Sequence, residues 1–259
     1  MDLLAPSHWR CVDFISDLHL QDADRNTFEA WAGYMRSTDA DAVFILGDLF
    51  EVWVGDDALQ PGSFEAECVH VLRAAGDRLA LYIMQGNRDF LMGPPLMQAC
   101  QATALPDPSV LVFGGERWLL SHGDALCTED HEYLAFRSQV RSSEWQRDFL
   151  AKPLSERQGI ARAIRNASEN RKQSQPAYAD VNIQAALRLL QDAHSKHLIH
   201  GHTHQPAQHQ LGAQCLRTVL SDWDVNAKPV RAEVLRLTID GPRANLARLP
   251  LASIARTAD

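Results

Sequence analysis

The 259-residue sequence lacks the marks of several protein classes. Its five cysteines are scattered, with no CxxC pair among them: Cys11, Cys68, Cys100, Cys127 and Cys215. Neither a disulfide framework nor a thiolate zinc site is therefore expected. No apolar run approaches the roughly 20 residues that span a bilayer, and the N-terminus lacks the long apolar run of a signal peptide. We expect a protein of the reducing cytoplasm that is soluble, or attached at most to a membrane surface.

Positive charge is also scarce. Lysine and arginine number 25 against 33 aspartates and glutamates, for a formal net charge of −8. This balance argues against a nucleic-acid partner, which usually needs a basic surface. One mid-chain stretch reverses the average and holds nine basic residues: Arg137, Arg141, Arg147, Lys152, Arg157, Arg162, Arg165, Arg171 and Lys172. Anion contacts and a merely solvated face are both compatible with it.

Three short apolar runs in the first hundred residues each stop at a polar cluster. The runs are residues 12–16, 42–46 and 79–84, and the clusters are Asp17-Leu18-His19, Gly47-Asp48 and Gly86-Asn87-Arg88-Asp89. Short runs rich in Val, Ile and Phe indicate strands that are buried on both faces. Helical patterns at 25–36 and 64–78 separate them. The order β-α-β-α-β predicts parallel strands joined by right-handed crossovers.

The rest of the chain adds more strands and one long helical segment. We expect a hairpin of residues 110–113 and 118–121, a strand at 197–200, and a second hairpin of 234–239 with 244–249. Residues 130–193 have a helical texture without a strand signal. The sequence therefore predicts a core made of residues 1–129 and 196–259, with a helical cap inserted at 130–195.

Side chains that bind metals gather where these strands end. Five strand ends supply seven of them: Asp17, His19, Asp48, Asn87, His122, His202 and His204. Each motif alone has an ordinary explanation, since an isolated Gly-Asp is usually a turn or a helix cap. Sites in open α/β sheets form beyond the carboxyl ends of the strands, so five compatible strand ends together predict a metal site.

The chemistry of this set indicates two metal ions. Carboxylate, imidazole and amide-oxygen ligands without thiolates suit manganese, with zinc or iron as alternatives. Seven ligands exceed what one ion takes while leaving room for a substrate. Two ions that share a carboxylate and activate a water for attack on phosphorus account for the number.

The ordered motifs Asp-x-His, Gly-Asp, Gly-Asn, His-Gly-Asp and Gly-His-x-His resemble those of the calcineurin-like metallophosphoesterase superfamily. The resemblance spans most of the chain. It implies an α/β fold, an αββα sandwich flanked by helices. It also implies that Asp17, His19, Asp48 and His204 bind one ion, and that Asp48, Asn87, His122 and His202 bind the other, with Asp48 bridging the two.

One motif departs from many members of the superfamily. Gly-Asn-His there corresponds to Gly86-Asn87-Arg88 here. Arginine is no practical proton donor, but it clamps phosphate in bidentate fashion. This favours a leaving group that is itself a phosphate and needs little protonation. Pyrophosphate hydrolysis is the interpretation we prefer.

Longer segments resemble one branch of the superfamily, the UDP-2,3-diacylglucosamine diphosphatases of lipid A biosynthesis. They are residues 51–57, 86–91, 122–127 and 200–206. The resemblance implies two Mn²⁺ ions and attack of water on the α-phosphorus of a glycolipid nucleotide, which gives UMP and 2,3-diacylglucosamine 1-phosphate. Catalytic roles would fall to Asp48, Asn87, Arg88 and His122. Peripheral attachment to the cytoplasmic face of the inner membrane is implied as well.

The resemblance also implies contacts between the cap and the substrate. The residues concerned are Asn87, Arg88, Asp130, Ser168, Lys172 and His202. The family often has asparagine where this chain has Lys172, and Asp130 could equally cap the first helix of the segment. The apolar residues of the cap either form a slot for acyl chains or bury one another in a helical hairpin.

Two other functions stay open. The first is hydrolysis of a different substrate, which could be another nucleotide diphosphate, a phosphodiester or a phosphoprotein, because such enzymes share the metal centre. The second is a non-catalytic binding protein on the same scaffold, although such proteins typically lose ligands and this chain keeps all seven. The sequence leaves the oligomeric state open.

Overall fold

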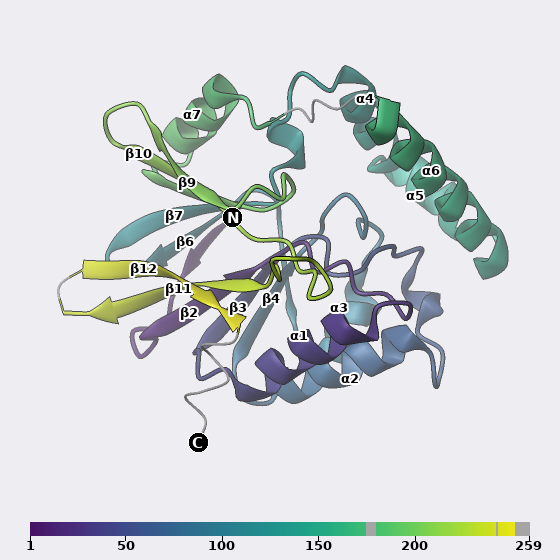
Figure 1. Cartoon of the computed structure of the whole chain (residues 1–259), viewed down its shortest axis with the longest axis horizontal. Helices are drawn as coiled ribbons and strands as arrows, with labels where there is room; N and C mark the ends of the chain where they lie inside the picture. Colours follow the sequence, from purple (N-terminus) through teal and green to yellow (C-terminus); the bar gives the residue numbers. More distant parts are fainter. Residues whose placement is uncertain (175–179, 242, 252–259) are drawn as a thin grey trace.

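The computed structural model describes residues 1–174, 180–241 and 243–251, with the backbone alone for 166–174 and 243. These residues form two six-stranded β-sheets that pack face to face, with helices outside (Figure 1). Sheet I has the order β1-β6-β7-β8-β10-β9, and sheet II has the order β12-β11-β2-β3-β4-β5.

The strands are β1 (Asp2–Leu4), β2 (Cys11–Ile15), β3 (Ala42–Leu46), β4 (Ala80–Met84), β5 (Thr103–Leu105), β6 (Ser109–Phe113), β7 (Glu116–Ser121), β8 (His197–His200), β9 (Ala207–Leu211), β10 (Cys215–Val219), β11 (Glu233–Asp240) and β12 (Arg243–Pro250). The helices are α1 (Arg25–Ser37), α2 (Phe64–Gly76), α3 (Pro94–Cys100), α4 (His131–Val140), α5 (Ser143–Leu150), α6 (Leu154–Ser174) and α7 (Ile183–Asp192). Short 3₁₀ helices span Asp56–Ala58 and Asp124–Leu126.

The first half of the chain builds the parallel part of sheet II. β2, β3, β4 and β5 pair in parallel in that order. β3 is buried throughout, because Val43 and Ile45 face the outer helices while Phe44 and Leu46 face sheet I. A strand covered on both faces needs an apolar residue at every position. The predicted β-α-β-α-β order and the hairpin of β6 with β7 are confirmed.

Side chains from both sheets fill the space between them. Phe44 stacks on Phe14 at 5.3 Å between ring centroids, within sheet II. Trp118 and Ile199 enter the same cluster from sheet I. Because Leu46 at the end of β3 and Ile199 near the end of β8 share this cluster, the C-terminal ends of strands from both sheets meet at one edge.

Helices cover both outer faces of the sandwich (Figure 1). α1 to α3 lie on sheet II, and α1 turns Phe28, Trp31 and Met35 toward the sheet at helical spacing. α7 lies on sheet I, where Ala186 and Leu190 pack beside residues of β7 and β8. Each sheet therefore has one face in the central core and one under helices.

Between β7 and β8 the chain leaves the sandwich and forms α4, α5 and α6, which project beside the strand ends (Figure 1). Phe149 of α5 is buried against the core and stacks on Trp145 at 4.6 Å. The guanidinium of Arg157 on α6 is also buried, and it donates to the carbonyl of Val54 and to the carboxylate of Asp57. Apolar packing and a buried cation thus hold these helices to the core.

The α/β sandwich flanked by helices, which the resemblance implies, is confirmed. The division into a core of residues 1–129 and 196–259 and a cap of residues 130–195 stays a prediction. Among the helices of the described ranges, none combines the length and the apolar character needed to cross a membrane.

Candidate metal centre and substrate cavity

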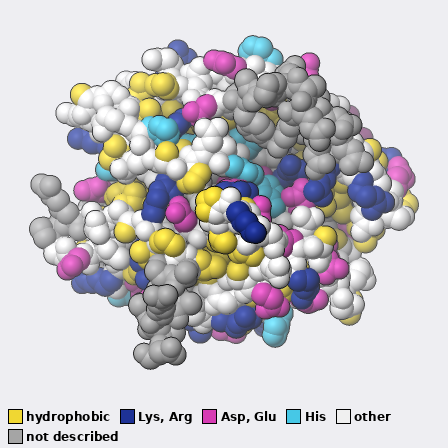
Figure 2. Space-filling view, in the orientation of Figure 1, with side chains coloured by type: hydrophobic (Ala, Val, Ile, Leu, Met, Phe, Trp, Pro, Cys, Tyr) yellow, Lys and Arg dark blue, Asp and Glu magenta, His cyan; other side chains and the backbone are white. Residues whose placement is uncertain are grey.

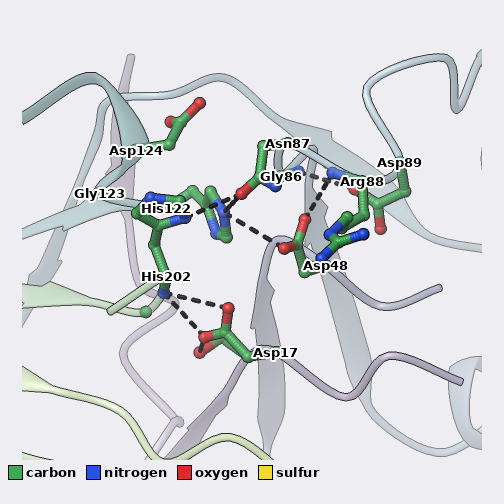
Figure 3. A network of polar contacts seen from close by, with 12 residues as sticks. Asp17, Asp48, Gly86, Asn87, Arg88, Asp89, His122, Gly123, Asp124 and His202 are labelled. Carbon is green, nitrogen blue, oxygen red and sulfur yellow. Dashed lines mark hydrogen bonds and ion pairs between the residues drawn. The ribbon is translucent and has the colours of Figure 1, made fainter. Parts of the chain in front are cut away.

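Five strand ends bring the predicted metal ligands to one edge of the sandwich, and Figure 3 shows five of these ligands: Asp17, Asp48, Asn87, His122 and His202. Asp17 and His19 follow β2, Asp48 follows β3, Asn87 follows β4, His122 follows β7, and His202 and His204 follow β8. Loops at the carboxyl ends of parallel strands are the usual place for polar groups that bind ligands in such folds. The two sheets together thus supply a single cluster.

Most of these ligands have an unusual backbone conformation. The φ angles lie between 48° and 66° at Asp17, His19, Asp48, His202 and His204. A left-handed conformation costs an L-residue roughly 1–2 kcal/mol. Strain of this kind persists where the surrounding structure enforces it, and it concentrates at functional sites. The strain therefore supports a functional role for these strand ends.

Glycines let the ligand loops approach one another. A Cβ atom on Gly86 would lie 2.1 Å from Oδ1 of Asp48, and one on Gly201 would lie 2.3 Å from Oδ2 of Asp17. Both distances are far below contact distance, so a larger residue would push the carboxylates out of place. The Gly-Asn and Gly-His motifs therefore need their glycines for space.

One group of donor atoms consists of Asp17, His19 and His204. Nε2 of His204 lies 3.4 Å from Oδ1 of Asp17 and 3.3 Å from Nε2 of His19. Nε2 of His19 also lies 4.0 Å from Oδ2 of Asp48. One donor atom from each residue of this group falls within 4.8 Å of the others, a spacing at which a single cation can be held.

A second group surrounds the side-chain oxygen of Asn87. This oxygen lies 2.9 Å from Nε2 of His122 and 2.8 Å from Nδ1 of His202 (Figure 3). Oδ2 of Asp48 is 3.7 Å from the same nitrogen of His122. Asp17, Asp48 and His122 also keep donor atoms within 4.8 Å of one another, so the two carboxylates lie between the groups.

Further hydrogen bonds orient the ligands. Nδ1 of His122 is 2.9 Å from the carbonyl of Leu46 and donates to it, which leaves Nε2 for a cation. Asp17 accepts hydrogen bonds from the Ser16 hydroxyl at 2.5 Å and from the His202 amide at 2.9 Å. The ligand atoms are thus placed by groups that belong to the fold itself.

The site has a negative potential. Burial alone would lower the pKa of His122, but Asp48 and Asp17 outweigh it and raise that pKa to about 9. Burial acts to raise the pKa of Asp17, yet the hydrogen bond and charge of His204 hold it well below its usual range. Burial and the charge of His122 lower the pKa of His202 to about 3, so its imidazole stays neutral. Carboxylates, neutral imidazole and an amide oxygen form a donor set that fits a divalent metal.

Known proteins are similar to this chain over most of its length. Residues 12–206 match the family model of the calcineurin-like phosphoesterases. The UDP-2,3-diacylglucosamine hydrolase of Bordetella pertussis is 41% identical over 234 residues, which cover 87% of this chain and 91% of that protein. The chain belongs to the calcineurin-like phosphoesterase family. Within it, the chain is a member of the family of the UDP-2,3-diacylglucosamine hydrolases.

Two more comparisons agree with this placement. The UDP-2,3-diacylglucosamine hydrolase of Chromobacterium violaceum is 44% identical over 222 residues, which cover 82% of this chain and 90% of that protein. A dimetal phosphatase of Danio rerio has a TM-score of 0.50 at 13% identity, over 93% of this chain and 96% of that one. The latter likeness concerns the fold alone. The predictions of the family and of a hydrolase are confirmed.

A cavity of about 690 Å³ adjoins the candidate metal centre of this phosphoesterase. Four of the predicted substrate residues line it: Asn87, Arg88, Asp130 and His202. Asp130 also caps α4, because its Oδ1 accepts a hydrogen bond from the Tyr133 amide at 2.9 Å. Ser168 and Lys172 fall on α6, and their side chains lie outside the described residues. The predicted contacts of these six residues with a substrate stay predictions.

The remaining wall of the cavity combines charged side chains with a set of apolar ones. It includes Trp53, Val54, Phe90, Leu91, Phe136, Trp145, Phe149 and Ile164. In the space-filling view, histidine side chains come to the surface near the centre of the molecule, beside hydrophobic, acidic and basic ones (Figure 2). The phosphoesterase therefore has a polar site that opens into a cavity between the core and α4 to α6, with polar and apolar side chains in its wall.

Buried Asp89, which sequence reasoning left out, joins two ligand loops. Its Oδ2 accepts the amide of Leu49 at 2.8 Å and that of Phe50 at 3.3 Å, while its Oδ1 accepts the amide of Gly86 at 2.7 Å. The carboxylate therefore ties the loop after β3, which carries Asp48, to the loop after β4. The motif places this residue directly after Asn87 and Arg88, but nothing in its spacing indicates a structural role.

Three more carboxylates, which the sequence analysis did not include among the site residues, lie around the predicted ligands. Glu51 lies 3.0 Å from Nδ1 of His19, and Asp222 lies 3.6 Å from Nδ1 of His204. Asp124 accepts hydrogen bonds from the Tyr133 hydroxyl and, at 2.7 Å, from Nε of Arg137 on α4. Asp222 follows β10. A search for polar residues at strand ends would have included it if that strand had been predicted.

Proposed function

We propose that the chain hydrolyses the pyrophosphate bond of UDP-2,3-diacylglucosamine with two Mn²⁺ ions. Water adds to the α-phosphorus, and the bond to the bridging oxygen breaks. The products are UMP and 2,3-diacylglucosamine 1-phosphate. The observation that carries the proposal is the cavity, which has Asn87, Arg88 and His202 among its polar residues and a set of aromatic and aliphatic side chains beside them. Such a cavity suits a ligand with both a diphosphate and acyl chains.

The ligand groups described above support two metal positions. One ion would be held by Asp17, His19, Asp48 and His204, and the other by Asp48, Asn87, His122 and His202. Bound there, divalent ions supply an activated water and withdraw charge from the phosphoryl oxygens. The carboxylates of Asp17 and Asp48 lie between both groups, which is what a bridging ligand requires.

Arg88 takes the place at which other phosphoesterases have a proton-donating histidine. Its amide donates to Oδ1 of Asp48 at 2.8 Å, and its guanidinium lies at the cavity beside Asn87. A guanidinium binds phosphate oxygens in bidentate fashion without giving up its proton. It would hold the phosphate that leaves with the sugar, and a phosphate leaving group needs no added proton.

The surface beside the cavity supports attachment to the cytoplasmic face of the inner membrane. Val52, Leu150 and Ile164 are exposed apolar side chains, and Val52 and Ile164 line the cavity. Arg147 and Lys152 are exposed close to Leu150 in the sequence, where they pair with the exposed carboxylates of Asp148 and Glu156. Apolar side chains beside basic ones are the usual features of a peripheral contact with anionic lipid. The glycolipid substrate would then enter from the membrane, and no nucleic-acid partner is proposed.

Hydrolysis in H₂¹⁸O tests the reaction and the substrate together. The manganese-loaded chain should release UMP that carries the label, because the α-phosphorus receives the water oxygen. Label in the sugar phosphate would refute attack at that atom. UDP-glucosamine without acyl chains is the matched substrate, and an equal kcat/KM for the two would refute the lipid assignment. Asp48→Ala should lose both bound manganese and hydrolysis, and retained hydrolysis would refute the metal assignment.

A further inference from the structure

Glu51 is a buried carboxylate at the wall of the cavity, and both of its oxygens have basic neighbours. Oε2 lies 3.0 Å from Nδ1 of His19. Oε1 lies 3.3 Å from Nη1 of Arg88 and 3.1 Å from Nε of Arg165 on α6. One side chain therefore touches a metal ligand, the arginine of the Gly-Asn-Arg motif and a helix of the cap.

The backbone places Glu51 beside His19 independently of the cap. The Glu51 amide donates to the carbonyl of Leu20 at 3.1 Å, and the Leu20 amide donates to the carbonyl of Leu49 at 3.0 Å. The His19 amide donates to the carbonyl of Asp48 at 3.0 Å. The loops after β2 and β3 thus run side by side as a continuation of the sheet. The contact between Glu51 and His19 follows from that pairing.

This ion-pair contact bears on which nitrogen of His19 faces the metal site. The negative charge of Glu51 beside Nδ1 favours a proton on that nitrogen, which leaves the lone pair of Nε2 for the metal. Nε2 does face the site, at 3.3 Å from Nε2 of His204 and 4.0 Å from Asp48. Carboxylate partners of metal-binding histidines have this effect generally.

Oε1 of Glu51 brings the guanidinium groups of Arg88 and Arg165 together. Arg88 comes from the loop after β4 and Arg165 from α6, and both line the cavity. Without a carboxylate between them, two cations at this distance would repel each other. The negative charge of Glu51 and the positive charges of Arg88 and Arg165 leave these three side chains with a net positive charge, which favours an incoming diphosphate.

We propose that Glu51 is a positioning residue that orients His19 for metal binding and sets Arg88 and Arg165 for the diphosphate. The proposal rests on the proposed function, since it assumes that a metal and a diphosphate occupy this site. Glu51 touches neither; it acts through the three side chains around it.

The competing explanation is that Glu51 merely straps the cap to the core. Asp57 offers a matched comparison, because it pairs with Arg157 of the same helix α6 and contacts none of the proposed ligands. If both carboxylates only held the cap to the core, substitution of either one would have a similar effect. Only the loss of Glu51 would disturb His19.

The test measures manganese affinity on the full chain after chelation, by titration calorimetry, together with kcat and KM for UDP-2,3-diacylglucosamine. Glu51→Gln should weaken manganese binding about 10–100-fold, as loss of a histidine-orienting partner does, and should raise KM. Glu51→Asp, which keeps the charge, should recover part of the affinity. Arg165→Gln should raise KM roughly tenfold while manganese affinity stays unchanged.

Asp57→Asn is the control and should bind manganese within a factor of about three of the wild type. Wild-type manganese affinity in Glu51→Gln would overturn the proposal, and so would an equal loss in Asp57→Asn. Failure of the wild-type chain itself to bind manganese or to release UMP would instead refute the proposed function. Circular dichroism of every variant shows whether an affinity was measured on folded protein.

Discussion

Asp89 offers the sharpest test of how the fold holds its metal site. This fully buried carboxylate accepts the amides of Leu49, Phe50 and Gly86, and so joins two loops that carry proposed ligands. Asp89→Ala removes the only side chain that links these amides, as far as the described residues show. We expect a loss of stability and a loss of metal affinity in the same variant.

The magnitude follows from two opposing effects. Each buried amide left without an acceptor costs about 1–3 kcal/mol, so three cost roughly 3–9 kcal/mol. Burial and the charge of Asp48 raise the pKa of Asp89, so removing the carboxylate recovers part of this. One pKa unit corresponds to about 1.4 kcal/mol. The rise of the pKa of Asp89 from 3.8 to about 7 offsets roughly 4 kcal/mol near neutral pH, so we expect a net loss of about 1–5 kcal/mol for alanine. Asparagine keeps one acceptor and should lose about 2 kcal/mol.

Urea unfolding with excess chelator gives the stability, and calorimetric titration with manganese gives the affinity. The control is Asp13→Asn, because Asp13 is equally buried and accepts hydrogen bonds from Arg236, Tyr34 and Thr38 but touches no proposed ligand. It should lower stability and leave manganese affinity unchanged. If Asp89→Ala lost less than about 1 kcal/mol, or if both variants bound manganese equally well, the loops would not depend on this carboxylate.

Three further predictions concern other parts of the molecule. Arg88→His should lower turnover of the diphosphate substrate about 10–100-fold at unchanged manganese content, and normal turnover would contradict the role given to this arginine. Arg157→Met should cost about 2–4 kcal/mol, because the Val54 carbonyl loses its buried donor while the exposed Asp57 is rehydrated, and limited proteolysis should then cut the cap faster than the wild type. Burial and the charge of Asp124 raise the pKa of Asp107 in the folded chain. The folded state therefore holds a proton that the unfolded state has lost above about pH 3.8, and stability falls as pH rises from there to the raised pKa. Asp107→Asn should be more stable than the wild type at neutral pH, on the order of 1 kcal/mol, and the difference should vanish near pH 3; a gain that does not depend on pH would contradict this cause.

The sequence predicts the elements whose pattern is set by burial on both faces. β3 is the clearest example, since its residues 42–46 are all buried and all apolar. Polar residues directly after such strands can then be predicted as ligands, because the carboxyl ends of the strands meet at one edge whatever the conformation of the loops. For this reason the amino-acid order alone groups seven residues that are scattered over the chain.

Short and exposed elements do not carry such a pattern. β1 and β5 have three residues each, and β9 (Ala207–Leu211), which lies at the edge of sheet I, has three polar residues in a row. These strands exist through pairing with neighbours that lie far away in the sequence. Carboxylates such as Glu51 are hidden for the same reason, since its partner Arg165 belongs to a helix from the middle of the chain.

The contacts that hold the proposed ligands differ from the contacts that hold the cap to the core. This difference explains how one fold can keep its metal site while its cavity changes. The proposed ligands lie on loops tied to both sheets, through Leu46 and Asp89 among others, and these ties involve no cap residue. The cap instead reaches the core through Arg157, Arg165 and α4. A change in the cap can therefore reshape the cavity while these ties stay in place, except where the cap itself meets the site, as Arg141 does at the Gly86 carbonyl and Tyr133 does at His202. Glu51 contacts both the cap and His19, so a change in the cap at this point would alter the binding of the metal.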